Sequence, residues 1–130
     1  MRLLLLTLLI VFFGCLNRNK ASRISIVPAT LLNETITHPS KDSNYISRFD
    51  YFIVKEGNDD RNKNVIEEYA KKHRTDSIKF YKHYEMIFFK ESKRINIETI
   101  KDTEPEYHWK LTITEEPIVT YIWIDGEFAR

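Results

Sequence analysis

The sequence predicts an α+β fold in which one helix packs on an antiparallel sheet of four to five strands. Three observations support this fold class. Ile far outnumbers Leu beyond residue 16, and branching at Cβ favours strands over helices. Residues 78–88 alternate apolar and polar side chains with the period of a half-buried strand. Residues 61–74 show apolar side chains at helical spacing instead. We therefore expect a compact domain over residues 49–130 in the order strand, helix, meander.

The first half of this domain contains the clearest elements. Residues 49–56 form an apolar run that ends at Gly57, which indicates a strand followed by a turn. The expected helix over residues 61–74 repeats its apolar positions at Val65, Ile66, Tyr69 and Ala70. Lys71, Lys72 and Arg74 stand where the helix dipole favours cations, so we expect the helix to end there.

Shorter apolar runs make up the second half of the domain. We expect strands at residues 94–100, 107–114 and 118–124, separated by turn-forming stretches at 102–105 and 115–117. Asp125 and Gly126 indicate a tight turn near the end. The core candidates in this half are Trp109, Leu111, Ile122 and Ile124.

This order of elements resembles the cystatin arrangement, in which a sheet wraps around one helix. The resemblance is topological. The sequence contains no Gln-x-Val-x-Gly inhibitory motif, so the resemblance implies a fold and no inhibitory residues.

The first sixteen residues have the layout of a secretory signal. Arg2 precedes an apolar run over residues 3–13, and Gly14 and Cys15 follow. As a helix, residues 3–16 would reach about 21 Å, which is less than the roughly 30 Å hydrocarbon core of a bilayer. The segment therefore predicts a signal rather than a membrane-spanning helix.

The ending Gly14-Cys15 resembles the signal of small bacterial lipoproteins. In that family the peptide is cut before the Cys, whose thiol is diacylated with fatty chains such as palmitate. Carried over to this sequence, residues 1–14 would be the signal peptide and Cys15 the lipidated first residue. Cys15 is the single cysteine of the chain, so no disulfide forms within it. An uncleaved or differently cut signal is the alternative.

Residues 15–48 are predicted to form the lipidated N-terminus and a flexible tether. They are rich in Asn, Ser, Thr and Lys and contain Pro28 and Pro39. A short strand at residues 23–27 is the alternative.

Composition excludes several classes of function. Twenty basic against nineteen acidic residues give a net charge of +1, so bulk charge does not select nucleic acid. Three glycines cannot build a glycine-rich nucleotide-binding loop, and we expect no nucleotide partner. Asp60, Asn62 and Asn64 match the first ligand spacings of a calcium loop, but Val65 replaces its essential Gly. We predict neither a metal nor a cofactor.

The remaining candidate residues indicate binding more than catalysis. Tyr81, His83 and Glu85 are expected on one strand face, where they would be surface polar groups or hold a proton. Trp109 and Trp123 are aromatic rings that suit contacts with a protein partner. These five residues are the predicted interaction residues, and no catalytic motif is found.

These observations predict an exported, membrane-anchored lipoprotein of the bacterial cell envelope, at the outer membrane or the periplasmic face. Its small domain would bind another protein. The alternatives are an immunity or inhibitor protein acting on an envelope or secreted protein, a purely structural envelope component, and a small envelope enzyme. A cleft of convergent titratable groups with perturbed pKa values would favour the enzyme, whereas a flat, exposed aromatic patch would favour a protein partner.

Overall fold

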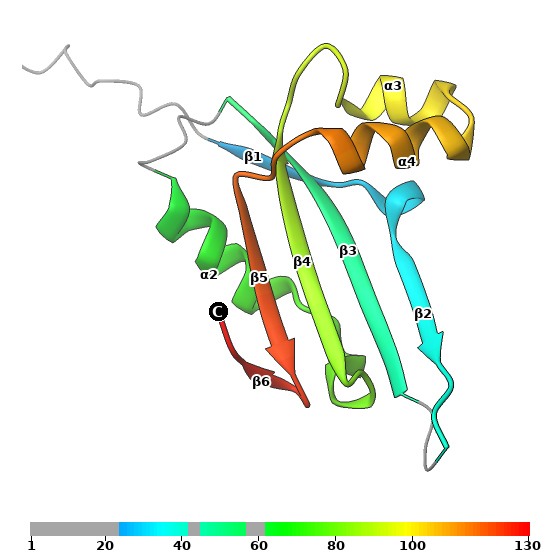
Figure 1. Cartoon of the computed structure of the whole chain (residues 1–130). Coiled ribbons are helices and arrows are strands. Elements are labelled where there is room, and N and C mark those ends of the chain that lie inside the picture. Colours follow the sequence, from blue (N-terminus) through cyan, green and yellow to red (C-terminus); the bar gives the residue numbers. More distant parts are fainter. Residues whose placement is uncertain (1–23, 42–44, 57–61) are drawn as a thin grey trace, which may run out of the picture.

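Six strands form one sheet that carries helices on both sides. The computed structural model describes residues 24–41, 45–56 and 62–130. The strands are β1 (Ser25–Pro28), β2 (Glu34–His38), β3 (Tyr45–Lys55), β4 (His83–Lys90), β5 (Val119–Ile124) and β6 (Glu127–Phe128). The helices are α2 (Lys63–His73), α3 (Ile97–Asp102) and α4 (Pro105–Thr114), with short 3-10 turns η1 (Thr30–Leu32) and η2 (Asp76–Phe80) (Figure 1).

The sheet is mixed. Its order is β1-β3-β4-β5-β6, and β2 also pairs with β3. β1 and β2 lie one after the other along the same edge of β3, and both are antiparallel to it. β3 and β4 are parallel, and the chain between them contains α2. β4 and β5 are antiparallel neighbours, and β5 continues through a turn into β6. The central seam of the sheet is therefore the parallel pair β3–β4.

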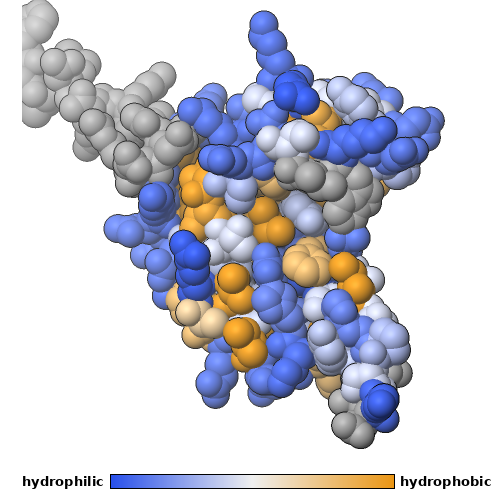
Figure 2. Space-filling view, viewed as in Figure 1, coloured by the Kyte–Doolittle hydropathy of each residue, from blue (hydrophilic) through white to orange (hydrophobic). Residues whose placement is uncertain are grey.

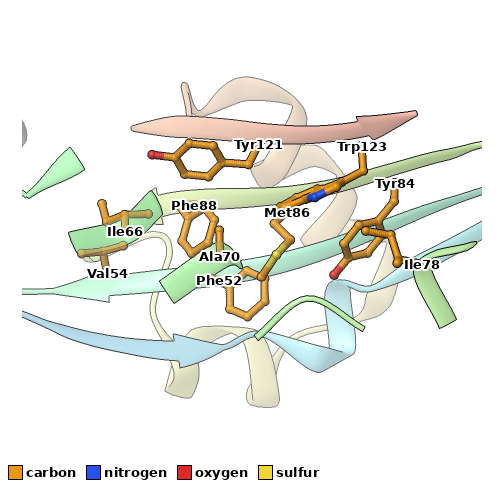
Figure 3. Packing of buried hydrophobic residues seen from close by; sticks show 10 residues of the cluster. All are labelled: Phe52, Val54, Ile66, Ala70, Ile78, Tyr84, Met86, Phe88, Tyr121 and Trp123. Carbon is orange, nitrogen blue, oxygen red and sulfur yellow. The ribbon is translucent and has the colours of Figure 1, made fainter. Parts of the chain in front are cut away.

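One face of the sheet, which we call the covered face, is closed by α2 and η2. Side chains of a strand alternate between the two faces, so Tyr84, Met86 and Phe88 of β4 all point to this side. Ile66 and Ala70, one helical turn apart on α2, are completely buried against them. Figure 3 shows this cluster, which comprises Phe52, Val54, Ile66, Ala70, Ile78, Tyr84, Met86, Phe88, Tyr121 and Trp123.

The opposite face, which we call the split face, is covered by helices of the described residues at one end only. There η1, α3 and α4 pack on the ends of β3 and β4. The buried residues of this second cluster are Ala29, Leu32, Tyr51, Ile53, Phe89, Ile95, Ile100 and Leu111. Figure 1 shows α3 and α4 together at the upper end of the sheet, with the lower half of the strands bare of helix on this side.

The expected combination of helix and sheet is found, but the arrangement differs from the prediction. The sheet is mixed rather than antiparallel, because β3 and β4 are parallel. Residues expected as strands at 94–100 and 107–114 form α3 and α4. Pro105 occupies the first turn of α4, and Asn96 caps α3 by accepting a hydrogen bond from Thr99 N at 2.8 Å. These start signals outweigh the β-branched composition.

The long strand expected at residues 78–88 is also shorter at its start. Asp76–Phe80 form η2, and β4 begins at His83. The alternation itself is correct from His83 onwards, because residues 84, 86 and 88 are buried while 83, 85 and 87 are partly exposed. Ile78 is buried as expected, but it reaches the core from η2.

Part of the predicted tether belongs to the folded domain. Residues 25–28 and 34–38 pair with β3, and Ala29 N donates a hydrogen bond to Tyr51 O at 2.8 Å. Among the described residues, the folded domain therefore includes residues 24–41 as well as those from Phe49 onwards, and β1 corresponds to the alternative strand at residues 23–27. The proposed signal and Cys15 lie outside the described residues. Over residues 24–41, 45–56 and 62–130, none of the helices is both long and apolar enough to cross a membrane.

Candidate functional site: the open half of the split face

The candidate site is the half of the split face that no described helix covers, which we call the open patch. Figure 2 shows apolar side chains interspersed with hydrophilic ones over this part of the sheet. Ile124 is 47% exposed and Ile36 is 38% exposed, although both lie on strands. From the strand pairing, the patch comprises Glu34, Ile36, His38, Tyr45, Ser47, Phe49, His83, Glu85, Ile87, Thr120, Ile122, Ile124 and Glu127. Phe49 and Ile87 lie at its border, where they also pack against the second core cluster.

A histidine and a carboxylate occupy the centre of the open patch. His83 Nε2 lies 2.5 Å from Glu85 Oε1, so the two side chains form a hydrogen bond along β4. Their side chains are 33% and 20% exposed, respectively. The ring of Phe49, on the neighbouring strand β3, lies 6.0 Å from the ring of His83. The pair is therefore partly sheltered by an aromatic ring while it remains accessible to solvent.

A second polar pair lies beside the first. His38 Nε2 is 3.1 Å from Ser47 Oγ, and the ring of His38 stacks on Tyr45 with centroids 4.4 Å apart. Ser47 is 4% exposed, so its hydroxyl group is almost completely sheltered. Ser47 is also the register partner of His83 on β4. Strands β2, β3 and β4 thus place the buried Ser47 between two histidines, His38 on β2 and His83 on β4.

Two carboxylates influence the same region. Burial raises the pKa of Glu34 above its ordinary value. Burial also raises the pKa of Tyr51, and the negative charges of Glu34 and Glu85 raise it further. Both effects have the expected sign, because desolvation and nearby negative charge disfavour an anion. The two carboxylates therefore lie close enough to Tyr51 to act on it together, at the border between the open patch and the helices.

The charged network on the covered face has a structural role. Tyr84 is completely buried and its hydroxyl donates a hydrogen bond to Asp50 Oδ2 at 2.8 Å. Arg48 Nε donates to Asp50 Oδ1 at 2.7 Å, and Arg48 also donates to Thr35 Oγ1 at 2.9 Å. Burial, followed by the bond to Asp50, raises the pKa of Tyr84 far above its ordinary value. The network satisfies a buried phenol and joins β2, β3 and β4.

The structure brings together two of the predicted interaction residues. His83 and Glu85 are in contact, as the strand alternation implied. Tyr81 is separated from them, because it precedes β4 and its ring packs on Tyr84 of the covered face. Trp123 is 1% exposed and belongs to the core, so it presents no ring to a partner. Trp109 lies in α4, and its side chain is outside the described part.

Other expected residues take different places. Leu111 is buried as predicted, but it packs from α4 rather than from a strand. Ile122 and Ile124, two of the core candidates, lie on the open patch instead. Asp60 lies outside the described residues. Ser47 and His38 lie in the segment predicted as a tether, and no pattern in the sequence identifies them as site residues.

The strand pairing around Ser47 does not provide the backbone donors of an acyl-transfer site. An acyl-transfer site needs backbone N–H groups that are available to an oxyanion. Around Ser47, β3 pairs with β2 on one side and with β4 on the other, so the ladders engage these groups. Within the described ranges, no group of three or more His, Cys, Asp or Glu side chains is arranged to hold a metal ion.

A separate hollow of about 790 Å³ lies beyond the open patch, where β4 ends and the chain leaves α4. Its lining includes Lys63 and Lys90 together with Glu91, Glu115 and Glu116. The charges are of both signs, and none of the open-patch residues contributes to it. The hollow therefore belongs to a different region of the molecule.

Comparisons of the chain with protein-family models, with curated proteins and with solved structures gave no match.

Proposed function

We propose that this protein is a lipoprotein of the bacterial cell envelope, anchored through Cys15, whose α+β domain binds another protein through the open patch. The observation that carries the binding role is the incomplete helical layer on the split face. α3 and α4 cover one half, while Ile36, Ile122 and Ile124 of the other half are accessible to solvent. Exposed apolar surface of this kind is typical of interaction sites.

The chemistry of the open patch supports binding over catalysis. Its polar groups hydrogen-bond to one another in pairs, His83 with Glu85 and His38 with Ser47. Paired groups of this kind are ready to orient a partner at a surface, and the strand ladders leave Ser47 without the donors that an acyl-transfer reaction requires. An immunity or inhibitor protein is one form of this function, because such proteins act through a docking surface.

The length of chain between the proposed anchor and the sheet is compatible with this role. Residues 15–24 precede β1 and span at most about 35 Å when fully extended. Lipid chains on Cys15 would hold the domain near the membrane surface, since each buried CH₂ contributes about 0.8 kcal/mol. The bound protein would then itself be in the envelope or pass through it.

The anchor is tested by replacing its sulfur. We expect the Cys15→Ser protein to incorporate no radioactive palmitate and to move from the detergent phase to the aqueous phase. The intact mass of the mature wild-type protein should show a chain that starts at Cys15 and carries fatty chains. Detergent partitioning that is unchanged by Cys15→Ser, or a native mass that retains residues 1–14, would contradict the anchor.

The binding role is tested by changing the surface while keeping the fold. We expect Ile124→Asp to abolish recovery of a partner after chemical crosslinking in cells, because it places a charge in an apolar contact. Thr37→Asp is the matched control, since Thr37 is an exposed strand residue whose side chain points to the other face. Equal loss of crosslinking in both variants would exclude the open patch as the binding surface.

A further inference from the structure

The open patch differs from the whole chain in its balance of acidic and basic residues. The sequence is close to neutral, with 20 basic and 19 acidic residues. The open patch contains the carboxylates of Glu34, Glu85 and Glu127, and neither Lys nor Arg occurs among its described strand residues. The open patch therefore offers three carboxylates to a partner and no lysine or arginine.

Apolar side chains separate these carboxylates. Ile36 and Phe49 lie on β2 and β3, and Ile122 and Ile124 lie on β5. Phe49 and Ile122 are partly buried, whereas Ile36 and Ile124 are exposed. A matching surface needs an apolar stripe with positive charges beside it.

The dimensions favour one helix as the occupant. Five residues of a strand extend about 14 Å, and four neighbouring strands are about 15 Å wide before side chains are added. The area that these two lengths enclose is much smaller than the roughly 800 Å² that a standard interface buries on each partner. A helix is about 10 Å across, and eleven residues of it extend about 16 Å. The helix α2, which covers part of the other face, has this length.

The architecture also favours a helix over a strand. An added strand pairs with the edge of a sheet, whereas the open patch is part of a sheet face. Helices already cover the other half of the same face, so one more helix would continue the layer formed by α3 and α4.

From these observations we propose that the open patch binds a short amphipathic helix of a partner protein that carries Lys or Arg along its apolar stripe. This inference rests on the proposed binding function. The apolar stripe packs on Phe49, Ile122 and Ile124, and the cationic groups of the helix form ion pairs with Glu34 and Glu85. A second copy of the chain fits less well, because the carboxylates of two open patches would face each other.

The experiment places a photo-crosslinking amino acid at Ile122 of the full chain in cells that produce the protein. After irradiation, mass spectrometry identifies the peptide joined to this position. We expect an amphipathic segment with Lys or Arg at helical spacing. The same amino acid at Thr37, on the other face, is the control and should not trap this segment. If the Ile122 variant does not accumulate, Ile124, which is more exposed, takes its place.

Charge reversal then tests the electrostatic part. With the trapped segment synthesised as a peptide, Glu85→Lys should weaken its binding by about tenfold or more, and Glu85→Gln should weaken it less. A segment without basic residues, an adduct with residues 1–23, with a second copy or with lipid, or equal affinity in Glu85→Lys would overturn this inference. Absence of any protein adduct at both Ile122 and Ile124 would overturn the binding function as well.

Discussion

Alternate residues of the same strands point to the two faces of the sheet, and they differ strongly in their exposure to solvent. On β5, Trp123 is 1% exposed and packs against Tyr84, with ring centroids 5.4 Å apart, whereas the next residue, Ile124, is 47% exposed. On β4, Tyr84 and Met86 are completely buried, but His83 and Glu85, which alternate with them, reach solvent. The covered face holds the larger buried cluster, and the open patch is the surface that we propose for binding. The predictions below test this division.

The largest effect is expected from removing the edge strands. A chain that starts at Asp42 lacks β1, β2 and η1, and it loses Ala29 and Leu32 from the core of the split face. It also leaves β3 unpaired along one edge. We expect no cooperative thermal unfolding transition by circular dichroism, whereas a chain that starts at Ile24 should unfold cooperatively. A cooperative transition in the shorter chain would show that residues 24–41 are dispensable.

Two neighbouring substitutions on β5 compare the faces directly. Trp123→Ala should lower the free energy of unfolding by about 3–5 kcal/mol, because it opens a cavity among Tyr84, Met86 and Phe128. Ile122→Ala, one position earlier on the opposite face, should cost about 1 kcal/mol. Urea unfolding of both variants measures the difference. Equal losses would contradict the division between the two faces.

A smaller effect is expected at the buried hydroxyl of the covered face. Tyr84→Phe removes the hydrogen bond to Asp50 and should lower the free energy of unfolding by about 1 kcal/mol at pH 7. The pKa of Tyr84 is raised in the folded state above its ordinary value of 10.0. Its favourable contribution is therefore complete below about pH 10 and is lost as the pH rises further. Stability measured between pH 9 and 11 should fall less steeply in Tyr84→Phe than in the wild type.

The smallest effect on stability is expected at the centre of the open patch. Glu85→Gln should change the free energy of unfolding by no more than about 0.5 kcal/mol, because the bond to His83 lies at a partly exposed surface. Thermal unfolding at pH 7.5 tests this value. A loss as large as that of Trp123→Ala would assign Glu85 to the core of the fold and would confound the binding experiments.

The elements that could be predicted from the sequence are those in which one strong pattern acts alone. The helix expected at residues 61–74 is found at Lys63–His73, and the strand expected at 118–124 is found at Val119–Ile124. The turn at Asp125 and Gly126 is also correct, and both residues have positive φ angles of 53° and 83°. Such angles suit a tight hairpin turn.

The errors have two physical causes. In α4, β-branched residues suggested a strand, although His108 and Leu111 are spaced for one helical face and Pro105 stands at the first turn. In β2, the sequence Glu-Thr-Ile-Thr-His has too few apolar residues to signal a strand. Its pairing with β3 is tertiary information, because an edge strand exposes most of its side chains.

The candidate site was only partly predictable for the same reason. The pattern His83-x-Glu85 places two groups on one strand face, and alternation alone reveals this. The pairing of His38 with Ser47 depends on β2 lying beside β3, which the chain before Phe49 does not indicate. The exposure of Ile122 depends on where α3 and α4 end, and no pattern within β5 contains that information.

The parallel seam between β3 and β4 has a consequence for the order of folding. Ser47 pairs with His83, which lies 36 positions later, whereas His38 and Tyr45, which are partners in the β2–β3 pair, are only seven positions apart. A chain synthesised or threaded from its N-terminus can close the β2–β3 hairpin early, but Phe52 and Val54 stay uncovered until α2 and β4 arrive. Until the seam closes, these apolar side chains are exposed, and exposed apolar surface of this kind favours aggregation.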